Sequence, residues 1–184
     1  MSDELAVKIM KFLIGKRINK IDFSRGLGII PSKFIVSLSD EDFHYELEIE
    51  SNFRVIYNGV MLCCFEDIYS TIDGEIISKK VFNQQNDFEL TYLFDSLRKA
   101  NDIIANKRIT SCKLFKFGDC LIGINRNIKL HIINDNHYND SLIYRILDCN
   151  TKKIVQCKNK KEYLINSPLF EVFYRNKKIE IINK

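Results

Sequence analysis

The chain has 184 residues, a length that suits one domain or two small fused halves around a sizeable core. Hydrophobic residues make up 46% and charged residues 28%, a composition typical of folded globular proteins rather than disordered ones. No apolar run approaches the roughly 20 residues that cross a bilayer, and the first residues lack the basic and apolar regions of a signal peptide. The composition therefore predicts a cytoplasmic protein without a membrane partner.

The net charge of +4 is divided unevenly along the chain. Residues 1–91 contain 10 Lys and Arg against 15 Asp and Glu, whereas residues 92–184 contain 18 against 9. The first half therefore carries −5 and the second half +9. Such an asymmetry bears on the choice of partners more than the total charge does.

Two helices are predicted from apolar residues that recur at helical spacing. In residues 2–14 these residues share one face, and residues 87–104 repeat the pattern. The two apolar faces are expected to consist of Leu5, Ile9, Phe12 and Leu13, and of Leu90, Leu93, Phe94, Leu97 and Ile104.

Strands follow each predicted helix. Residues 43–49 alternate between apolar and polar side chains, as do residues 127–132. Residues 39–42 and 125–127 read as turns, and Asn58-Gly59 is a strong signal for a type I′ hairpin. Because the strands follow one another in hairpins, an antiparallel arrangement is favoured over parallel βαβ units.

A short repeat links the two halves. "GKRI" at 15–18 returns as "NKRI" at 106–109, and each copy leads after 37 residues to a second arginine, in "FRVI" at 53–56 and "YRIL" at 144–147. We interpret the chain as an α+β protein of two diverged tandem repeats, each a helix followed by an antiparallel β-meander, packed as one compact body; coincidence is the alternative. The repeats would span residues 1–86 (acidic) and 87–147 (basic), with further strands in 148–184.

The repeated arginines have structural and functional interpretations. Arg17 and Arg108 each follow a predicted helix, where a basic side chain can bind the free carbonyl groups; an anion site is the functional alternative. For Arg54, a cross-strand ion pair with the glutamates of residues 43–49 is expected.

The acidic strand is the most distinctive predicted surface. If the apolar residues of 43–49 point inward, the polar ones line an exposed face next to the acidic turn that precedes them. Such a face either docks a basic protein partner or is simply solvated. The predicted partner-binding residues are Asp40, Glu41, Asp42, His44, Glu46, Glu48 and Glu50.

The basic second half offers a different interpretation. Lysines interspersed with tyrosines could bind nucleic acid through phosphate contacts and base stacking, although ordinary solubilising lysines would look the same. The residues of this alternative are Lys129, His131, Lys158, Lys160 and Lys161.

Signals for catalysis or metal binding are weak. The three histidines, His44, His131 and His137, match no metalloprotease spacing, and no Gly-rich phosphate loop or nucleophile elbow is present. The six cysteines form no CxxC motif, although two pairs, Cys112/Cys120 and Cys149/Cys157, share a C-x7-C spacing. We expect no catalytic residues, metal or cofactor; an enzyme built around His131 and His137 is the third hypothesis.

The arrangement "LIGKRINKIDF … FIVSL … YELEIESNFRVI" resembles small bacterial immunity-type proteins associated with polymorphic toxins. In those proteins a Leu-x-Gly-Lys-x-Ile opening precedes alternating strands and an aromatic-Arg-aliphatic triplet; here Phe53 stands where Trp is often seen. The resemblance covers mainly residues 12–65. It implies a non-catalytic protein that binds and blocks a cognate toxin, and it assigns no contact residues.

Overall fold

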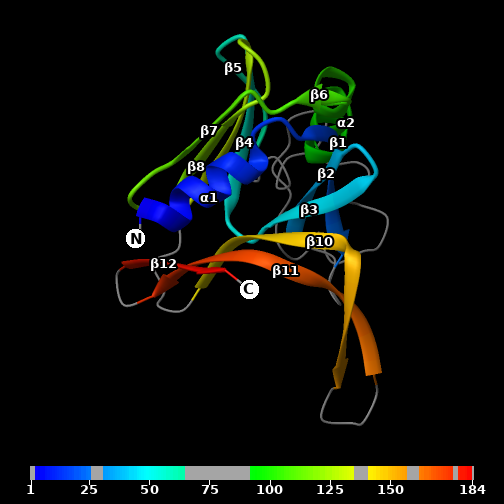
Figure 1. Ribbon diagram of the computed structural model, residues 1–184. Coiled ribbons are helices and arrows are strands. Elements are labelled where there is room, and N and C mark those ends of the chain that lie inside the picture. Colours follow the sequence, from blue (N-terminus) through cyan, green and yellow to red (C-terminus); the bar gives the residue numbers. More distant parts are fainter. Residues whose placement is uncertain are drawn as a thin grey trace, which may run out of the picture.

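In the part of the chain that the computed structural model describes, two helices lie beside two antiparallel sheets (Figure 1). Among the residues that the structure describes, no helix is both long and apolar enough to cross a membrane. The described residues are 3–25, 31–64, 92–134, 141–156, 162–175 and 178–183.

The first predicted helix is confirmed as α1 (Asp3–Leu13). Ile9 and Leu13 are fully buried, and Leu5 and Phe12 pack partly buried against the same core. The strands that follow are β1 (Arg17–Arg25), β2 (Pro31–Asp40), β3 (Phe43–Ile49), β4 (Asn52–Tyr57) and β5 (Val60–Cys64).

The second helix, α2, spans Tyr92–Ile104, while residues 87–91 of the prediction, with Leu90, lie outside the described residues. Leu93, Leu97 and Ile104 are buried as expected, but the prediction for Phe94 was wrong, because its side chain is 40% exposed. Phe94 lies about 100° around the helix from Leu93, outside the buried stripe. The remaining strands are β6 (Lys107–Arg108), β7 (Ser111–Leu114), β8 (Cys120–Gly123), β9 (Ile128–Ile133), β10 (Ser141–Gln156), β11 (Glu162–Arg175) and β12 (Lys178–Asn183).

Each sheet contains strands from both halves of the chain. Within the described residues, one sheet has seven strands in the order β12-β11-β10-β3-β2-β1-β6, and the other has five in the order β5-β4-β9-β8-β7. The meander β1-β2-β3 belongs to the first sheet and the meander β7-β8-β9 to the second. The strand after each meander crosses to the other sheet, so that β4 pairs with β9 and β10 pairs with β3.

The two crossings enclose a shared hydrophobic core. Both helices and both sheets contribute side chains to one cluster. Phe34 of β2 and Phe53 of β4 bring the sheets together, with ring centroids 4.3 Å apart. Tyr144 of β10 is among the largest fully buried side chains. Neither half therefore has a core of its own.

The predicted turns are confirmed. Asn58 and Gly59 have φ values of 51° and 80°, which is the backbone of a type I′ turn. Between β8 and β9, the Asn125 side chain accepts hydrogen bonds from the N–H groups of Asn127 and Ile128, each at 2.9 Å. β3 has the predicted bounds, but β2 extends to Asp40, so that the predicted turn at 39–42 is reduced to residues 41–42.

The helix ends meet in a reciprocal pair of hydrogen bonds. The N–H of Gly15 donates to the carbonyl of Ile109 at 2.8 Å, and the N–H of Asn106 donates to the carbonyl of Ile18 at 2.7 Å. Gly15 and Asn106 have φ values of 92° and 62°, the left-handed conformation that often ends a helix. Gly15 and Asn106 are 91 positions apart in the sequence, and so are Ile18 and Ile109.

Beyond the end of the short strand β6, the side chain of Asn101 forms hydrogen bonds with the backbone edge of β1. Asn101 of α2 accepts a hydrogen bond from the N–H of Ile21 at 2.7 Å and donates one to its carbonyl at 2.8 Å. The Asn101 side-chain amide therefore forms the same two hydrogen bonds with β1 that the backbone of a neighbouring strand would form.

We predict that Asn101→Ala lowers the free energy of unfolding by about 1–2 kcal/mol, because both backbone groups of Ile21 lose a part-buried partner. Urea titration would measure the change. Asp102→Ala, on the exposed side of the same helix, is the control and should shift stability by less than about 0.5 kcal/mol. Equal effects of the two substitutions would contradict the role of the Asn101 bridge.

Candidate functional site

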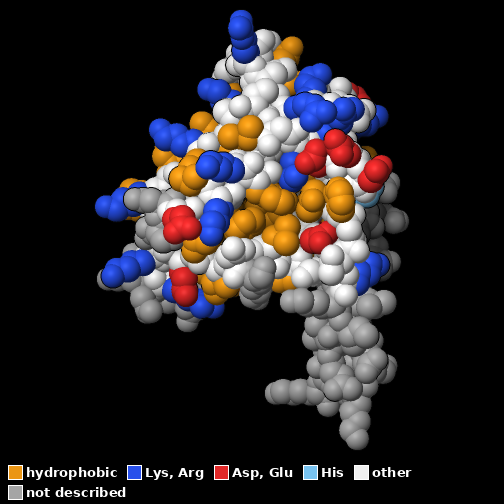
Figure 2. Space-filling view, viewed as in Figure 1, with side chains coloured by type: hydrophobic (Ala, Val, Ile, Leu, Met, Phe, Trp, Pro, Cys, Tyr) orange, Lys and Arg blue, Asp and Glu red, His pale blue; other side chains and the backbone are white. Residues whose placement is uncertain are grey.

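The turn between β2 and β3 presents acidic and aromatic side chains together. Asp40, Glu41, Asp42 and His44 are exposed, and Phe43 between them is 55% exposed. We call residues 40–44 the acidic turn. Figure 2 shows a group of acidic side chains over this turn, next to basic side chains near β6. The prediction that these four polar residues share an exposed surface is confirmed.

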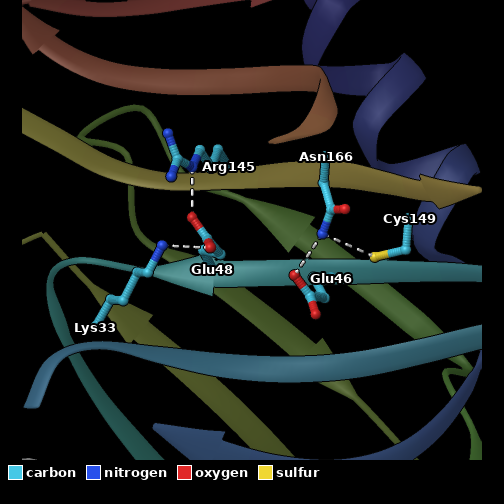
Figure 3. A network of polar contacts seen from close by, with 6 residues as sticks. All are labelled: Lys33, Glu46, Glu48, Arg145, Cys149 and Asn166. Atoms are coloured by element: carbon cyan, nitrogen blue, oxygen red, sulfur yellow. Dashed lines mark hydrogen bonds and ion pairs between the residues drawn. The ribbon is translucent and has the colours of Figure 1, made fainter. Parts of the chain in front are cut away.

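Glu48 does not belong to that surface. Its residue is only 4% exposed, and its two carboxylate oxygens bind Lys33 Nζ and Arg145 Nε from the flanking strands β2 and β10 (Figure 3). The expectation of an exposed Glu48 was wrong because β3 is an interior strand whose neighbours supply cations to cover it. A buried carboxylate held by two cations has a structural role.

Glu46 is also withdrawn from solvent in part. Asn166 Nδ2 of β11 donates to a Glu46 carboxylate oxygen at 3.1 Å and lies 3.4 Å from the Cys149 sulfur (Figure 3). Burial, followed by the charges of Glu46, Asp148 and Glu48, raises the pKa of the Cys149 thiol to about 11. Cys149 is therefore a protonated, weakly nucleophilic group at neutral pH.

Glu50 is exposed, but it lies beyond the opposite end of β3 from the acidic turn. At about 3.3 Å per residue, Glu50 and Asp42 are roughly 25 Å apart. The predicted continuous acidic face is thus wrong: it is interrupted by Glu46 and Glu48.

The expected ion pair of Arg54 with the glutamates was also wrong. Arg54 lies in the five-stranded sheet, opposite His131 and Cys64, whereas the glutamates belong to the seven-stranded sheet. The arginine that binds Glu48 is Arg145, 91 positions after Arg54 in the sequence. Because β4 lies in the five-stranded sheet and β10 pairs with β3 in the seven-stranded sheet, Arg145 rather than Arg54 lies opposite Glu48.

A buried lysine links the acidic turn to α1. Lys16 is only 6% exposed, and its Nζ lies 3.1 Å from Asp40 Oδ2. The same ammonium lies 4.4 Å from the ring centroid of Phe12 and 4.5 Å from that of Tyr45, within the range of cation–π attraction. Burial, and then the negative charges of Asp148 and Asp40, raise the pKa of Tyr45.

The aromatic rings around Lys16 form a partly exposed apolar band. Phe12 and Tyr45 pack edge to face with centroids 5.0 Å apart, and Phe12 also contacts Phe170 at 5.9 Å. Figure 2 shows hydrophobic side chains running from α1 towards β3 beside the acidic group. The alternation of residues 43–49 indicated Tyr45 as an inward residue, but nothing in the sequence linked it to Phe12 or Lys16.

The repeated arginines lie directly opposite each other on β1 and β6. Arg108 Nη1 donates to the Gly15 carbonyl at 2.7 Å. Gly15 lies two residues after the end of α1, so the expectation that Arg108 binds the free carbonyls of its own preceding helix, α2, was wrong. Both arginines line a polar hollow of about 350 Å³ with Asn19 and Glu41 among its other residues.

The basic residues of the second half are only partly described. Lys129 is exposed and His131 half-buried on β9, while Lys158, Lys160, Lys161 and His137 lie outside the described residues. His131 Nε2 is 3.8 Å from Asp119 Oδ2. His131 pairs with Leu121 rather than with Cys120, so that its side chain and the Cys120 thiol are on opposite faces of the sheet.

The described residues contain no group of three or more His, Cys, Asp or Glu side chains placed to hold a metal ion. The chain matches no protein-family model, and searches of curated proteins and of solved structures find no match. Arguments about function therefore rest on the arrangement of these side chains.

We predict that Glu48→Gln destabilises the protein by about 2–3 kcal/mol, because Lys33 and Arg145 would lose their shared counter-charge at a poorly solvated position. Chemical denaturation at neutral pH measures the change. The matched control is Glu50→Gln, since Glu50 is exposed just past the same strand; its effect should stay below about 0.5 kcal/mol. A Glu48→Gln protein as stable as the Glu50→Gln protein would refute the structural role.

Proposed function

We propose that this chain is a non-catalytic, cytoplasmic binding protein, an immunity or antitoxin-like inhibitor of a bacterial toxin. The acidic turn and the aromatic band beside it would form the docking surface. The observation that carries this proposal is the exposed Phe43 within a row of acidic side chains, next to the Phe12–Tyr45 pair.

The charge of the turn supports a basic partner. Asp40, Glu41 and Asp42 are consecutive and exposed; Lys16 pairs with Asp40, and Arg17 and Arg108 line the same hollow as Asp40 and Glu41. An exposed cluster of one sign accelerates the encounter with a surface of the opposite sign. A basic toxin domain fits this requirement.

The aromatic side chains support a protein rather than a small ion as the partner. Protein interfaces commonly combine a buried aromatic centre with a polar rim. Phe43 supplies an exposed ring, and the Phe12–Tyr45 band supplies partly exposed apolar surface beside it. A partner that covers this surface would bury aromatic area and meet the carboxylates at the rim.

The surrounding contacts hold the docking surface rigid. Lys16 ties Asp40 to α1, and Asn150 of β10 binds the backbone of His44 through both its N–H at 3.1 Å and its carbonyl at 3.0 Å. A surface that is already ordered loses less conformational entropy when it binds.

We further propose that the chain arose by tandem duplication. Gly15 and Asn106 exchange equivalent hydrogen bonds across the β1–β6 pair, and Arg17 lies opposite Arg108. The crossing strands β4 and β10 each follow a three-stranded meander and carry the two repeated triplets.

The docking surface is tested by Phe43→Ala and by the double substitution Glu41→Lys with Asp42→Lys. The bait is the tagged protein, in lysate from its source cells, and the captured proteins are quantified by mass spectrometry. We expect Phe43→Ala to weaken binding at least about 30-fold and the double variant to slow association most at low salt.

The matched controls are Phe117→Ala, which removes a ring that is 74% exposed elsewhere, and Glu4→Lys with Asp102→Lys, which makes the same charge change on the helices. Both should bind as the unaltered protein does. The captured protein should be basic and should inhibit growth when expressed alone. Capture that is indifferent to Phe43 and to the acidic turn would refute this surface, and a harmless partner would refute the inhibitor function.

The five-stranded sheet favours a second candidate, nucleic-acid binding. The described residues of β4, β5, β7, β8 and β9 include no Asp or Glu. The pairing register places Lys113, His131 and Arg54 in one row across the sheet, with Lys129 two residues along on the same face. Exposed cations on a sheet face can follow a phosphate backbone.

A fluorescently labelled oligothymidylate is the probe for this alternative. If the sheet binds it, affinity should fall linearly with salt on logarithmic axes, and Arg54→Ala with Lys129→Ala should reduce the slope by about 1.4. Lys8→Ala with Lys178→Ala, two exposed cations on other elements, is the control and should leave the slope unchanged. No measurable binding at low salt would remove this candidate.

A further inference from the structure

The hairpin of β7 and β8 brings two cysteines together. Their C-x7-C spacing places Cys112 opposite Ile122 and Cys120 opposite Leu114, so that the two cysteines occupy diagonal positions on one face of the hairpin. Their sulfur atoms are 3.7 Å apart, and both residues are thiols rather than halves of a disulfide. We infer that Cys112 and Cys120 form an oxidant-sensitive dithiol that closes to a reversible disulfide when it meets a peroxide.

The two sulfur atoms already lie 3.7 Å apart. Diagonal positions across a hairpin are about 7–8 Å apart, wider than the roughly 4.4–6.8 Å between the Cα atoms of a disulfide, so the bond requires the two strands to approach each other. The turn that joins the strands is well ordered, because the N–H of Phe115 donates to the Asp119 carbonyl at 2.8 Å and the N–H of Gly118 to the Phe115 carbonyl at 3.0 Å. Closure therefore needs side-chain rotation and a small approach of two paired strands.

The two thiols differ in exposure and in the direction of their pKa shifts, as a nucleophilic and a resolving thiol should. Cys112 is half-buried and Cys120 completely buried. A hydrogen bond from Cys120 lowers the pKa of Cys112, although burial opposes it. The same hydrogen bond, together with burial, raises the pKa of Cys120. Cys112 is thus the accessible nucleophile, and Cys120 is the resolving thiol held against it.

The chemistry balances with one peroxide molecule. The Cys112 thiolate attacks one peroxide oxygen and breaks the O–O bond, which gives a sulfenic acid at Cys112; the leaving hydroxide takes up a proton to become water. The Cys120 sulfur then attacks the Cys112 sulfur and breaks the S–O bond, and the oxygen leaves as a second water with the proton of Cys120. Two thiols are oxidised and the peroxide is reduced.

The disulfide would link the two strands at one edge of the five-stranded sheet. β7 is the terminal strand of the five-stranded sheet, and α1 packs against it. The hairpin lies beside α1 in Figure 1. A covalent link between β7 and β8 would oppose fraying of this edge, so oxidation should slow amide hydrogen exchange at Phe115, whose N–H donates to the Asp119 carbonyl across the hairpin.

The test treats the reduced full-length protein with hydrogen peroxide and follows intact mass, peptide mapping and hydrogen exchange. We expect a loss of about 2 Da, since disulfide formation removes two hydrogens. We also expect a cross-link between the peptides that contain Cys112 and Cys120, and its reversal by dithiothreitol. Cys149→Ser, which removes a thiol of raised pKa elsewhere, should oxidise as the unaltered protein does.

Single substitutions separate the roles of the two thiols. Cys112→Ser should abolish the cross-link, whereas Cys120→Ser should leave a sulfenic acid at Cys112 that dimedone traps. If a buried hydroxyl in the Cys120→Ser variant prevents folding, Cys120→Ala supplies the same test. A cross-link that persists in Cys112→Ser, disulfides formed mainly between other cysteines or between chains, or no mass loss at all would each overturn the inference.

Discussion

The antiparallel pairing of β3 with β10 is the constraint on which the arrangement depends. It brings Arg145 against Glu48, 97 positions earlier in the chain, a carboxylate that would otherwise be buried beside Lys33 alone. Beyond Asp148, β10 separates from β3, and Asn150 continues the contact by binding the backbone of His44. The same pairing therefore builds the seven-stranded sheet and holds the start of β3, where the acidic turn lies.

The reciprocal crossing of β4 and β10 makes the two halves depend on each other. Each half begins a sheet with its own meander and completes the other sheet with its next strand. The core residues Phe34 and Phe53 come from one half but belong to different sheets. An isolated half would expose much of the apolar surface that the whole chain buries, so one cooperative unit is expected.

Charge is distributed by position in the sheets more than by half of the chain. Acidic residues of the first half are exposed at the β2–β3 turn, whereas Glu48, near the end of β3, is buried and neutralised by cations of β2 and β10. Arg54 belongs to the acidic half, yet it joins the basic face of the five-stranded sheet. Lys16, next to an exposed arginine in the sequence, is buried between two aromatic rings. The distribution of charge over the surface is therefore determined by strand pairing.

Local patterns determined the helices, the alternating strands and the Asn58-Gly59 turn, because apolar periodicity and left-handed backbone preferences act over a few residues. The repeat also indicated equivalent positions such as Arg54 and Arg145. Only the tertiary structure decided that β10 pairs with β3, and hence that Glu48 is buried with Arg145 while Asp42 stays exposed. Alternation along a strand says which residues share a face, but burial of that face depends on what distant strands place over it. For the same reason, the sequence spacing of Cys112 and Cys120 did not predict that their sulfur atoms would be in contact; the register of the β7–β8 hairpin brings them together.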